Sequence, residues 1–288
     1  MKRFARRLIS LTAAVMTLLV LARADIYIDQ APPASWSPWD VLKLTTFPTA
    51  NNDSALLEVG GLSMLIDGGF KGYAQDMTRA LRELGYDGFV DVLYNTHPHD
   101  DHIGAVAQML RTGFRASLFV STFPKEYDEP GQTLAVAELD AAGIPYLQLG
   151  NCQAMDFGGA HIVFYYFPDG RDPNALSSIA HITFGNATIL LTADASTAAQ
   201  SYFHEELGPM LQADIMKFPH HAYTVMRREL LEDVKPGFVY VTNRRNSTPK
   251  ANEQLRARGI PFKHTSMGPI VMVTNGEDWY ITQTNNPF

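Results

Sequence analysis

The chain has 288 residues, of which 46% are hydrophobic, and a formal net charge of −7 at pH 7. This length and apolar content exclude a disordered chain and allow a large buried core in one or two domains. The single cysteine, Cys152, excludes an intramolecular disulfide, so the core and any bound metal must hold the fold.

The first residues have the pattern of a secretory signal peptide. A basic head precedes an apolar run from Leu8 to Leu21, and Ala22, Arg23 and Ala24 read as a cleavage site. The run is shorter than the roughly 18 apolar residues of a membrane anchor. Cleavage after residue 24 removes five of the 23 basic and none of the 30 acidic residues, which leaves a formal charge of −12. We expect a secreted or periplasmic protein without stable membrane insertion, whose charge disfavours nucleic acid as a partner.

The mature chain begins with an irregular lead-in and continues into a meander. Residues 25–40 hold three prolines and two tryptophans and carry no visible chemistry, so we expect one domain over 41–288. Alternating apolar residues and turn-forming residues predict strands at 41–47, 54–59 and 64–66. Helical spacing then predicts a helix over 73–84.

The rest of the chain alternates between strands and helices. It also repeats the opening order, in which a meander is followed by β/α units. The strands are predicted at 90–94, 117–120, 146–149, 160–167, 178–184, 188–192, 214–218 and 238–242. The helices are predicted at 103–111, 133–142 and 197–211. This order predicts an α/β fold in the form of a four-layer αββα sandwich, with two similar halves face to face and helices outside.

The densest chemistry lies between strand 90–94 and helix 103–111. Three histidines and two aspartates fall within six positions, namely His97, His99, Asp100, Asp101 and His102. Two of the histidines project to one side of an extended or turning backbone, and Asp101 and His102 can reach a second point. The ordered elements on both sides argue against a solvated polar loop, so the spacing indicates two metal ions.

This motif, with the run Leu65–Gly69 before it, resembles the metallo-β-lactamase superfamily, which adopts an αββα sandwich. More narrowly, Asn174, Ser177, the run Leu190–Asp194 and the run Lys217–His221 resemble the soluble metallo-β-lactamase-like domain of bacterial DNA-uptake competence channel proteins. The likeness covers about residues 41–281, which is nearly the whole mature chain.

The resemblance implies which residues hold metal. His97 and His99 would hold one ion, Asp101 and His102 the other, and Asp194 would bridge both. One residue of the pair His220 and His221 would complete the second site. If the backbone there is extended, neighbouring side chains point in opposite directions and only one of the two can face the metal. His221 is slightly preferred, and the sequence leaves the choice open.

The ligand types also indicate the cofactor and the reaction. Imidazoles and carboxylates suit zinc, with manganese or iron as alternatives, and the resemblance implies two ions. A water between two such ions becomes a hydroxide near neutral pH and attacks a carbonyl or phosphorus, so we expect a hydrolase. Asp101 and Asp194 would be catalytic through the metals, and Asp67 would support them by accepting a hydrogen bond from a ligand imidazole. Turn capping before Gly68 is the alternative role for Asp67.

Three departures from the superfamily pattern predict a weaker first site. Residues 174–177 contain no third histidine, and His181, in an apolar run, is a weaker candidate for that role. Ala193 and Ala222 stand where the superfamily has glycine. These departures leave a metal-poor binding module without turnover as an alternative.

The substrate is less sharply defined than the reaction. Arg244 and Arg245 in a loop after strand 238–242, and His264 further on, are expected to contact it. The competence-type resemblance favours a phosphodiester, whereas the acidic charge favours a small-molecule or nucleotide-like substrate. A lactone, β-lactam or ester is the alternative. Lys217 is read as an anion contact or a solvated lysine, and Cys152 as structural.

Overall fold

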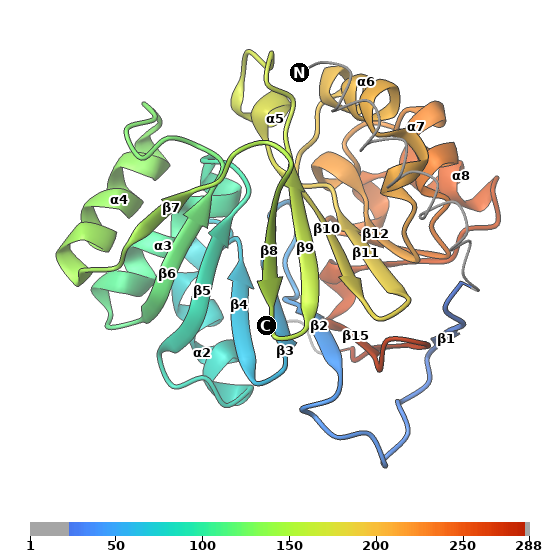
Figure 1. Cartoon of the computed structure of the whole chain (residues 1–288), viewed down its shortest axis with the longest axis horizontal. Coiled ribbons are helices and arrows are strands. Elements are labelled where there is room, and N and C mark those ends of the chain that lie inside the picture. Colours follow the sequence, from blue (N-terminus) through green and yellow to red (C-terminus); the bar gives the residue numbers. More distant parts are fainter. Residues whose placement is uncertain (1–22, 286–288) are drawn as a thin grey trace, which may run out of the picture.

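The structure is a computed structural model that describes residues 23–285 (Figure 1). The predicted signal peptide covers residues 1–24 and, apart from Arg23 and Ala24, lies outside the described residues. Within residues 23–285, no helix is both long and apolar enough to cross a membrane.

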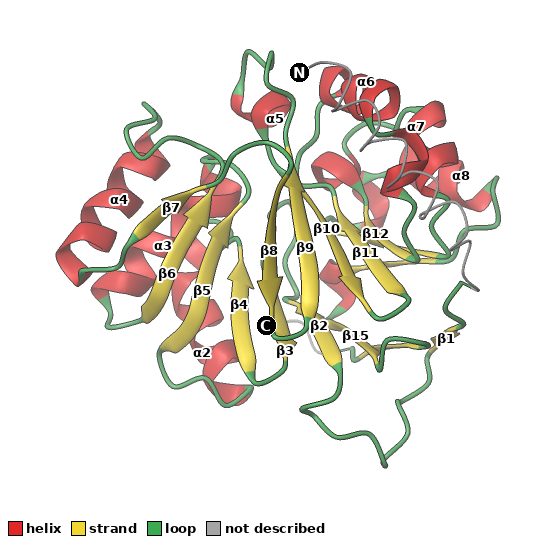
Figure 2. Ribbon diagram, in the orientation of Figure 1, coloured by secondary structure: helices red, strands yellow, loops and turns green. Residues whose placement is uncertain are grey.

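Two β-sheets lie face to face in the centre of the molecule (Figure 2). The nine-stranded sheet has the order β1 (Ile26–Ile28), β16 (Trp279–Gln283), β15 (Ile270–Thr274), β2 (Leu42–Thr46), β3 (Ala55–Val59), β4 (Leu62–Ile66), β5 (Phe89–Asn95), β6 (Arg115–Ser121) and β7 (Tyr146–Gln148). The seven-stranded sheet has the order β14 (Phe262–His264), β13 (Phe238–Val241), β12 (Ile215–Lys217), β11 (Ala187–Leu191), β10 (Ile179–Phe184), β9 (Ala160–Tyr165) and β8 (Gln153–Phe157).

Helices cover the outer face of each sheet (Figure 2). The first sheet carries α2 (Ala74–Glu83), α3 (Asp100–Arg111) and α4 (Pro130–Ala142). The second carries α6 (Thr197–Glu206), α7 (Arg228–Val234) and α8 (Pro249–Arg256). The shorter elements are α5 (Pro173–Leu176), η1 (Lys71–Tyr73), η2 (Gly208–Leu211), η3 (Pro219–Ala222), η4 (Arg245–Ser247) and η5 (Thr265–Met267). The predicted four-layer αββα architecture is confirmed.

Three apolar clusters fill the spaces between the layers. The central cluster joins the two sheets and includes Leu57 and Phe164. The second lies between the first sheet and α2 to α4, and the third between the second sheet and α6 to α8. This arrangement follows from the sequence, because strands buried on both faces must be apolar at nearly every position.

The two halves are less similar than the repeated order predicts. The hairpin β15–β16 comes at the end of the chain but joins the first sheet, where Met272 pairs with Leu44 of β2. Part of the expected lead-in forms β1, which pairs in parallel with β16. The predicted helix 197–211 ends at Glu206, because Gly208 has a φ of 48° and Pro209 restarts the chain as a 3-10 turn.

The carboxyl ends of the central parallel strands meet at one edge of the sandwich. Strands β4 and β5 run in parallel in the first sheet, as do β11, β12 and β13 in the second. The segments that follow these five strands begin with Asp67, Thr96, Thr192, Phe218 and Thr242. Functional groups gather at such edges in α/β proteins, and the predicted metal ligands follow the same strands.

Candidate metal centre

The hexapeptide supplies ligand atoms from a strand end and from the first turn of a helix. His97 follows β5, and His99 has an extended backbone that precedes α3. Helix α3 begins at Asp100 instead of the predicted residue 103, since carboxylates in a first turn interact favourably with the helix dipole. His97 Nε2 lies 3.1 Å from His99 Nδ1, and these two residues and Asp101 form one group with ligand atoms within 4.8 Å.

A second group joins this motif to the other sheet. Asp194 follows β11 and His221 follows β12, and both are buried. His102 Nε2 lies 3.3 Å from Asp194 Oδ1, and His221 Nε2 lies 3.2 Å from Asp101 Oδ2. These four residues offer ligand atoms that all lie within 4.8 Å of one another. The two groups share Asp101, so the two candidate metal positions are neighbours.

The histidine pair lies in left-handed backbone, not in an extended strand. His220 and His221 have φ values of 48° and 47°. His220 Nε2 lies 3.8 Å from Asp194 Oδ2, and His221 Nε2 lies 3.3 Å from the same oxygen. The expectation that one ring of the pair points away depended on an extended backbone, so it does not apply to this left-handed turn.

Asp67 anchors the motif through four hydrogen bonds. Its Oδ1 accepts from the Thr96 backbone N–H at 2.8 Å and from Asn95 Nδ2 at 2.9 Å. Its Oδ2 accepts from Thr96 Oγ1 at 2.8 Å and lies 2.7 Å from His102 Nδ1. This last contact leaves His102 Nε2 facing Asp194, which is the arrangement expected of a carboxylate that orients a metal-binding imidazole.

Glycines let the Asp67 turn approach helix α3. The N–H groups of Gly68 and Gly69 donate to the His102 carbonyl at 2.6 and 3.0 Å. A Cβ at Gly104 would lie 2.9 Å from the backbone N of Lys71, so only glycine fits at this crossing. The close approach brings Asp67 within hydrogen-bond distance of His102.

A buried ion pair beside the centre involves two residues whose roles the sequence did not reveal. Lys217 Nζ lies 2.7 Å from Asp53 Oδ2 and 3.7 Å from Asp194 Oδ1, and it donates to the Ala193 carbonyl at 2.7 Å. Asp53 Oδ1 lies 3.4 Å from His221 Nδ1. The reading of Lys217 as solvated was therefore wrong.

Strand pairing is the signal that could have found Asp53. Strands β3 and β4 pair antiparallel with Ala55 opposite Ile66, so the residues before β3 lie beside those after β4. Ser54 Oγ accordingly donates to the Asp67 carbonyl at 2.9 Å. The register of this hairpin therefore places Asp53, just before β3, near Asp67, just after β4.

His221 is also held from the second sheet. Its Nδ1 lies 2.9 Å from Thr242 Oγ1, and its carbonyl accepts from Asn243 Nδ2 at 2.8 Å. His264 is also buried and contacts Asn243 instead of the ligand groups. Its Nδ1 lies 3.0 Å from the Asn243 carbonyl and its Nε2 lies 3.0 Å from Asn252 Oδ1. With both ring nitrogens engaged there, His264 braces the loop that holds His221.

The remaining candidates are not gathered into the ligand groups. Arg244 and Arg245 are exposed in the loop after β13. His181 Nε2 lies 2.9 Å from the Gln212 carbonyl, and Cys152 is exposed. Asn174, in the stretch without a histidine, has its Nδ2 at 3.4 Å from His220 Nε2.

The carboxylates raise the proton affinity of two ligand histidines. Burial lowers the pKa of His102, but Asp194, Asp67 and Asp53 outweigh it and raise the pKa to about 10. Burial also lowers the pKa of His221, and carboxylates led by Asp194 and Asp53 raise it well above the usual value. Without another cation, protons therefore occupy these imidazoles.

Two further histidines of the centre, His97 and His220, are held neutral. Burial lowers the pKa of His97, and the neighbouring His102 lowers it further. Burial likewise lowers the pKa of His220. For Asp194, burial raises the pKa, but His221 and His102 outweigh it and hold the pKa well below its usual range. An ionised carboxylate and neutral imidazoles are the forms that bind metal.

Unpartnered buried atoms show that these residues fit a metal. Among residues 23–285, His102 Nε2, Asp194 Oδ1 and His221 Nε2 are buried and make no hydrogen bond. Such atoms normally have a partner, because an unpaired buried polar group is costly. Their convergence, with imidazole and carboxylate donors, matches what zinc, manganese or iron requires.

Part of the sequence and the fold of this chain are similar to those of known proteins. Residues 49–116 match the family model described as "Metallo-beta-lactamase superfamily". No curated protein matches the sequence. Of the solved structures, the metallo-beta-lactamase fold protein YhfI from Bacillus subtilis has a TM-score of 0.52 and 14% identity, over 84% of this chain and 100% of that chain.

A second similar structure is CmlA, a diiron beta-hydroxylase from Streptomyces venezuelae. It has a TM-score of 0.52 and 15% identity, over 77% of this chain and 52% of that chain, so this chain spans about half of its length. The narrower likeness to competence channel proteins stays a prediction. Residues 49–116 are therefore similar to the metallo-β-lactamase superfamily, as the motif predicted, and the similar structures show the same fold over most of the chain.

Proposed function

We propose that the protein is a hydrolase that uses two divalent metal ions, with zinc as the first expectation and manganese or iron as alternatives. The observation that carries the proposal is the convergence of three buried ligand atoms that lack a hydrogen bond, on His102, Asp194 and His221. Atoms in this state favour a bound cation, because one metal centre can satisfy all three, whereas an empty site with neutral imidazoles would leave them without partners.

The charge of the site supports two ions over one. Asp53, Asp67, Asp101 and Asp194 bring four negative charges, and Lys217 brings one positive charge. Two divalent cations and one hydroxide would balance this set, whereas one cation with a neutral water would leave a net negative charge in a largely buried place. Uncompensated buried charge is strongly disfavoured.

The distances support one ligand set for each ion. His97 and His220, whose Nε2 atoms lie 3.9 and 3.8 Å from Asp194 Oδ2, would hold one ion together with His99, and His220 would take the place of the missing third histidine. Asp101, His102 and His221, whose ligand atoms group with those of Asp194, would hold the other ion. In this proposal Asp194 bridges the two positions, and both members of the histidine pair are ligands.

The chain's own groups would orient the ligands and hold their protons. Asp67 keeps the proton of His102 on Nδ1, and Thr242 and Asp53 do the same for His221, so Nε2 of each ring faces the centre. Bound ions of this kind supply a hydroxide nucleophile near neutral pH and stabilise negative charge in the transition state. No side-chain nucleophile is required.

We propose a phosphodiester or a similar small anionic molecule as the substrate. Arg244 is exposed, and its side chain makes no ion pair within residues 23–285. Its backbone N–H donates to Asn243 Oδ1, and the Asn243 amide donates to the carbonyl of His221. This connection sets the guanidinium on the loop that supports the centre, where it would contact an anionic substrate.

Metal analysis combined with turnover tests the proposal. We expect about two ions per chain, hydrolysis of bis-para-nitrophenyl phosphate, and loss of that activity in His99→Ala and Asp194→Ala. Nitrocefin and a lactone test the alternative substrates. Added salt should slow the phosphodiester reaction and affect Arg244→Ala less. Substoichiometric metal with no turnover after zinc or manganese is added would support a metal-poor binding module instead.

We also propose that residues 1–24 direct export and are removed. The supporting pattern is the basic head, the apolar run and the small residues at positions 22 and 24. Expression of the full chain in a bacterial host should give periplasmic or secreted protein whose N-terminus is Asp25. Recovery only of uncleaved protein in the cytoplasm would contradict this proposal.

A further inference from the structure

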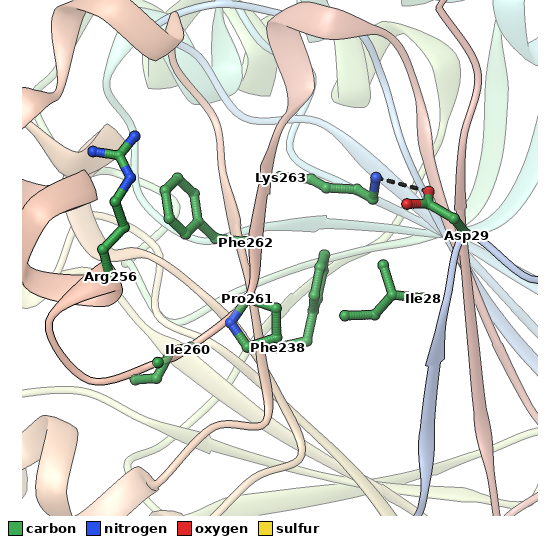
Figure 3. A pocket seen from close by; sticks show the side chains of 9 residues that line it. Ile28, Asp29, Phe238, Arg256, Ile260, Pro261, Phe262 and Lys263 are labelled. Carbon is green, nitrogen blue, oxygen red and sulfur yellow. Dashed lines mark ion pairs between the residues drawn. The ribbon is translucent and has the colours of Figure 1, made fainter.

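A groove lies at the edge of the sandwich where the outermost strands β1 and β14 come together (Figure 3). One part is a hollow of about 490 Å³ with apolar walls from Ile28, Phe238, Pro261 and Phe262. A second hollow of about 330 Å³ adjoins it and shares Arg256, Phe262 and Lys263. None of these residues belongs to the metal-ligand groups.

The second hollow gathers positive charge on a protein whose net charge is −7. Arg245, Arg256 and Lys263 line it, and none of the described residues that line it carries a carboxylate. Within residues 23–285, neither arginine makes an ion pair. Lys263 has an acidic partner in Asp29, but the two arginines have none there, so an anion between the cations would offset their mutual repulsion.

Two of these cations, Arg256 and Lys263, lie on either side of the Phe262 ring (Figure 3). The Arg256 guanidinium carbon lies 5.7 Å from the centre of the Phe262 ring. Figure 3 shows Arg256 and Lys263 on either side of Phe262, with Pro261, Phe238 and Ile28 beside them. A ligand that reached both cations would therefore lie along an apolar surface.

Asp29 on the rim of the first hollow competes for one of the cations. Its Oδ1 lies 2.8 Å from Lys263 Nζ, and the Asp29 side chain is 66% exposed. Because the carboxylate is largely exposed, it can return to water at little cost, so an incoming anion can displace it. The wall behind is fixed, because both ring nitrogens of His264 are engaged by Asn243 and Asn252.

We propose that this groove binds an amphiphilic oxyanion of the organic phosphate class. Guanidinium groups match phosphate oxygens in pairs, and three cations favour a dianion over a monoanion. The apolar walls suit an aliphatic or aromatic body attached to the charged group. The site goes beyond the proposed hydrolase function, because it uses other residues and requires no turnover.

Calorimetric titration of the metal-loaded protein with two phosphonates, which resist hydrolysis, tests this proposal. Phenylphosphonate should bind at least a few-fold more tightly than methylphosphonate, because only the former has a ring for the apolar walls. Arg245→Gln and Arg256→Gln should each weaken phenylphosphonate binding about tenfold, and Asp29→Asn should strengthen it a few-fold. Asparagine suits the Asp29 φ of 59° and keeps the side-chain volume.

Two control variants separate this site from the metal centre. Arg258→Gln removes the same charge from an exposed position that does not line the groove, and should leave binding unchanged. His99→Ala should likewise retain phenylphosphonate binding whatever it does to hydrolysis. The proposal is overturned if either groove arginine variant binds as wild type does, if Asp29→Asn fails to strengthen binding, or if binding is lost only in His99→Ala.

Discussion

Lys217 and Asp53 form a buried ion pair beside the metal-ligand groups. Nζ lies 2.7 Å from Oδ2, and the two side chains are 4% and 8% exposed. Burial raises the pKa of Asp53, but Lys217, His221 and His102 outweigh it and hold the pKa well below its usual range. The pair therefore contributes fixed charge to the site, and each member depends on the other.

Removal of one partner should destabilise the protein strongly. Lys217→Met leaves the Asp53 carboxylate buried without its closest cation, so we expect a loss of about 3–5 kcal/mol in the free energy of unfolding. The double variant Lys217→Met, Asp53→Asn should recover part of this loss. Urea unfolding of the chelator-treated protein measures both, and Lys125→Met is the control, since its more exposed pair with Asp140 should cost less than about 1 kcal/mol. Equal losses in both single variants would contradict the prediction.

Asp67 should matter for metal affinity. Asp67→Asn removes the carboxylate that lies 2.7 Å from His102 Nδ1 and fixes the orientation of that ring. We expect metal affinity, measured by competition with a chromogenic chelator, to fall about 10–100-fold. Asp91→Asn is a matched control, because Asp91 accepts two hydrogen bonds from Ser63 away from the centre. A similar fall in both variants would show a general effect on folding instead.

The histidine pair should serve two different ions. We expect His220→Ala to lose the ion near His97 and His99 and retain the other, and His221→Ala to lose the ion held with Asp101 and His102. Metal content after dialysis against a weak chelator gives the number of ions retained. His181→Ala should retain both ions, since the His181 ring lies 2.9 Å from the Gln212 carbonyl and belongs to none of the ligand groups formed by residues 23–285. Full metal content in His220→Ala would restrict the ligand role to His221.

The pH dependence of the metal-free protein should reveal the raised pKa of His102. The pKa of His102 rises from its usual 6.5 to about 10, so its protonated form stabilises the folded state. This contribution is fully present below pH 6.5 and is lost as the pH rises toward 10. Urea unfolding of chelator-treated protein at several pH values measures the decline.

Metal binding should displace the same protons. His102 and His221 must be neutral to bind an ion, so metal uptake at neutral pH should release protons, and metal affinity should rise with pH. Calorimetry in buffers with different ionisation enthalpies counts the protons released. Metal uptake without proton release, or a metal-free protein that becomes more stable toward pH 10, would contradict this assignment.

Local sequence patterns were enough to predict the layers and the central motif. The alternation of apolar strands and amphipathic helices depends on spacing within each segment, so the αββα sandwich could be inferred without knowing any distant contact. The hexapeptide from His97 to His102 could be found for the same reason. Its candidate ligands lie within six consecutive residues, so they stay close together however the rest of the chain packs.

Only the tertiary structure decided how distant segments complete the site. Asp53 and Lys217 are 164 positions apart in the sequence, and their contact depends on the packing of two sheets. The left-handed backbone at His220 and His221 turns both rings toward Asp194, which single-residue propensities do not predict. The same packing separates Arg244, near the Asn243 support, from Arg245 in the groove. Sequence thus determined the kinds of groups present, while the long-range packing of the sheets decided which of them meet.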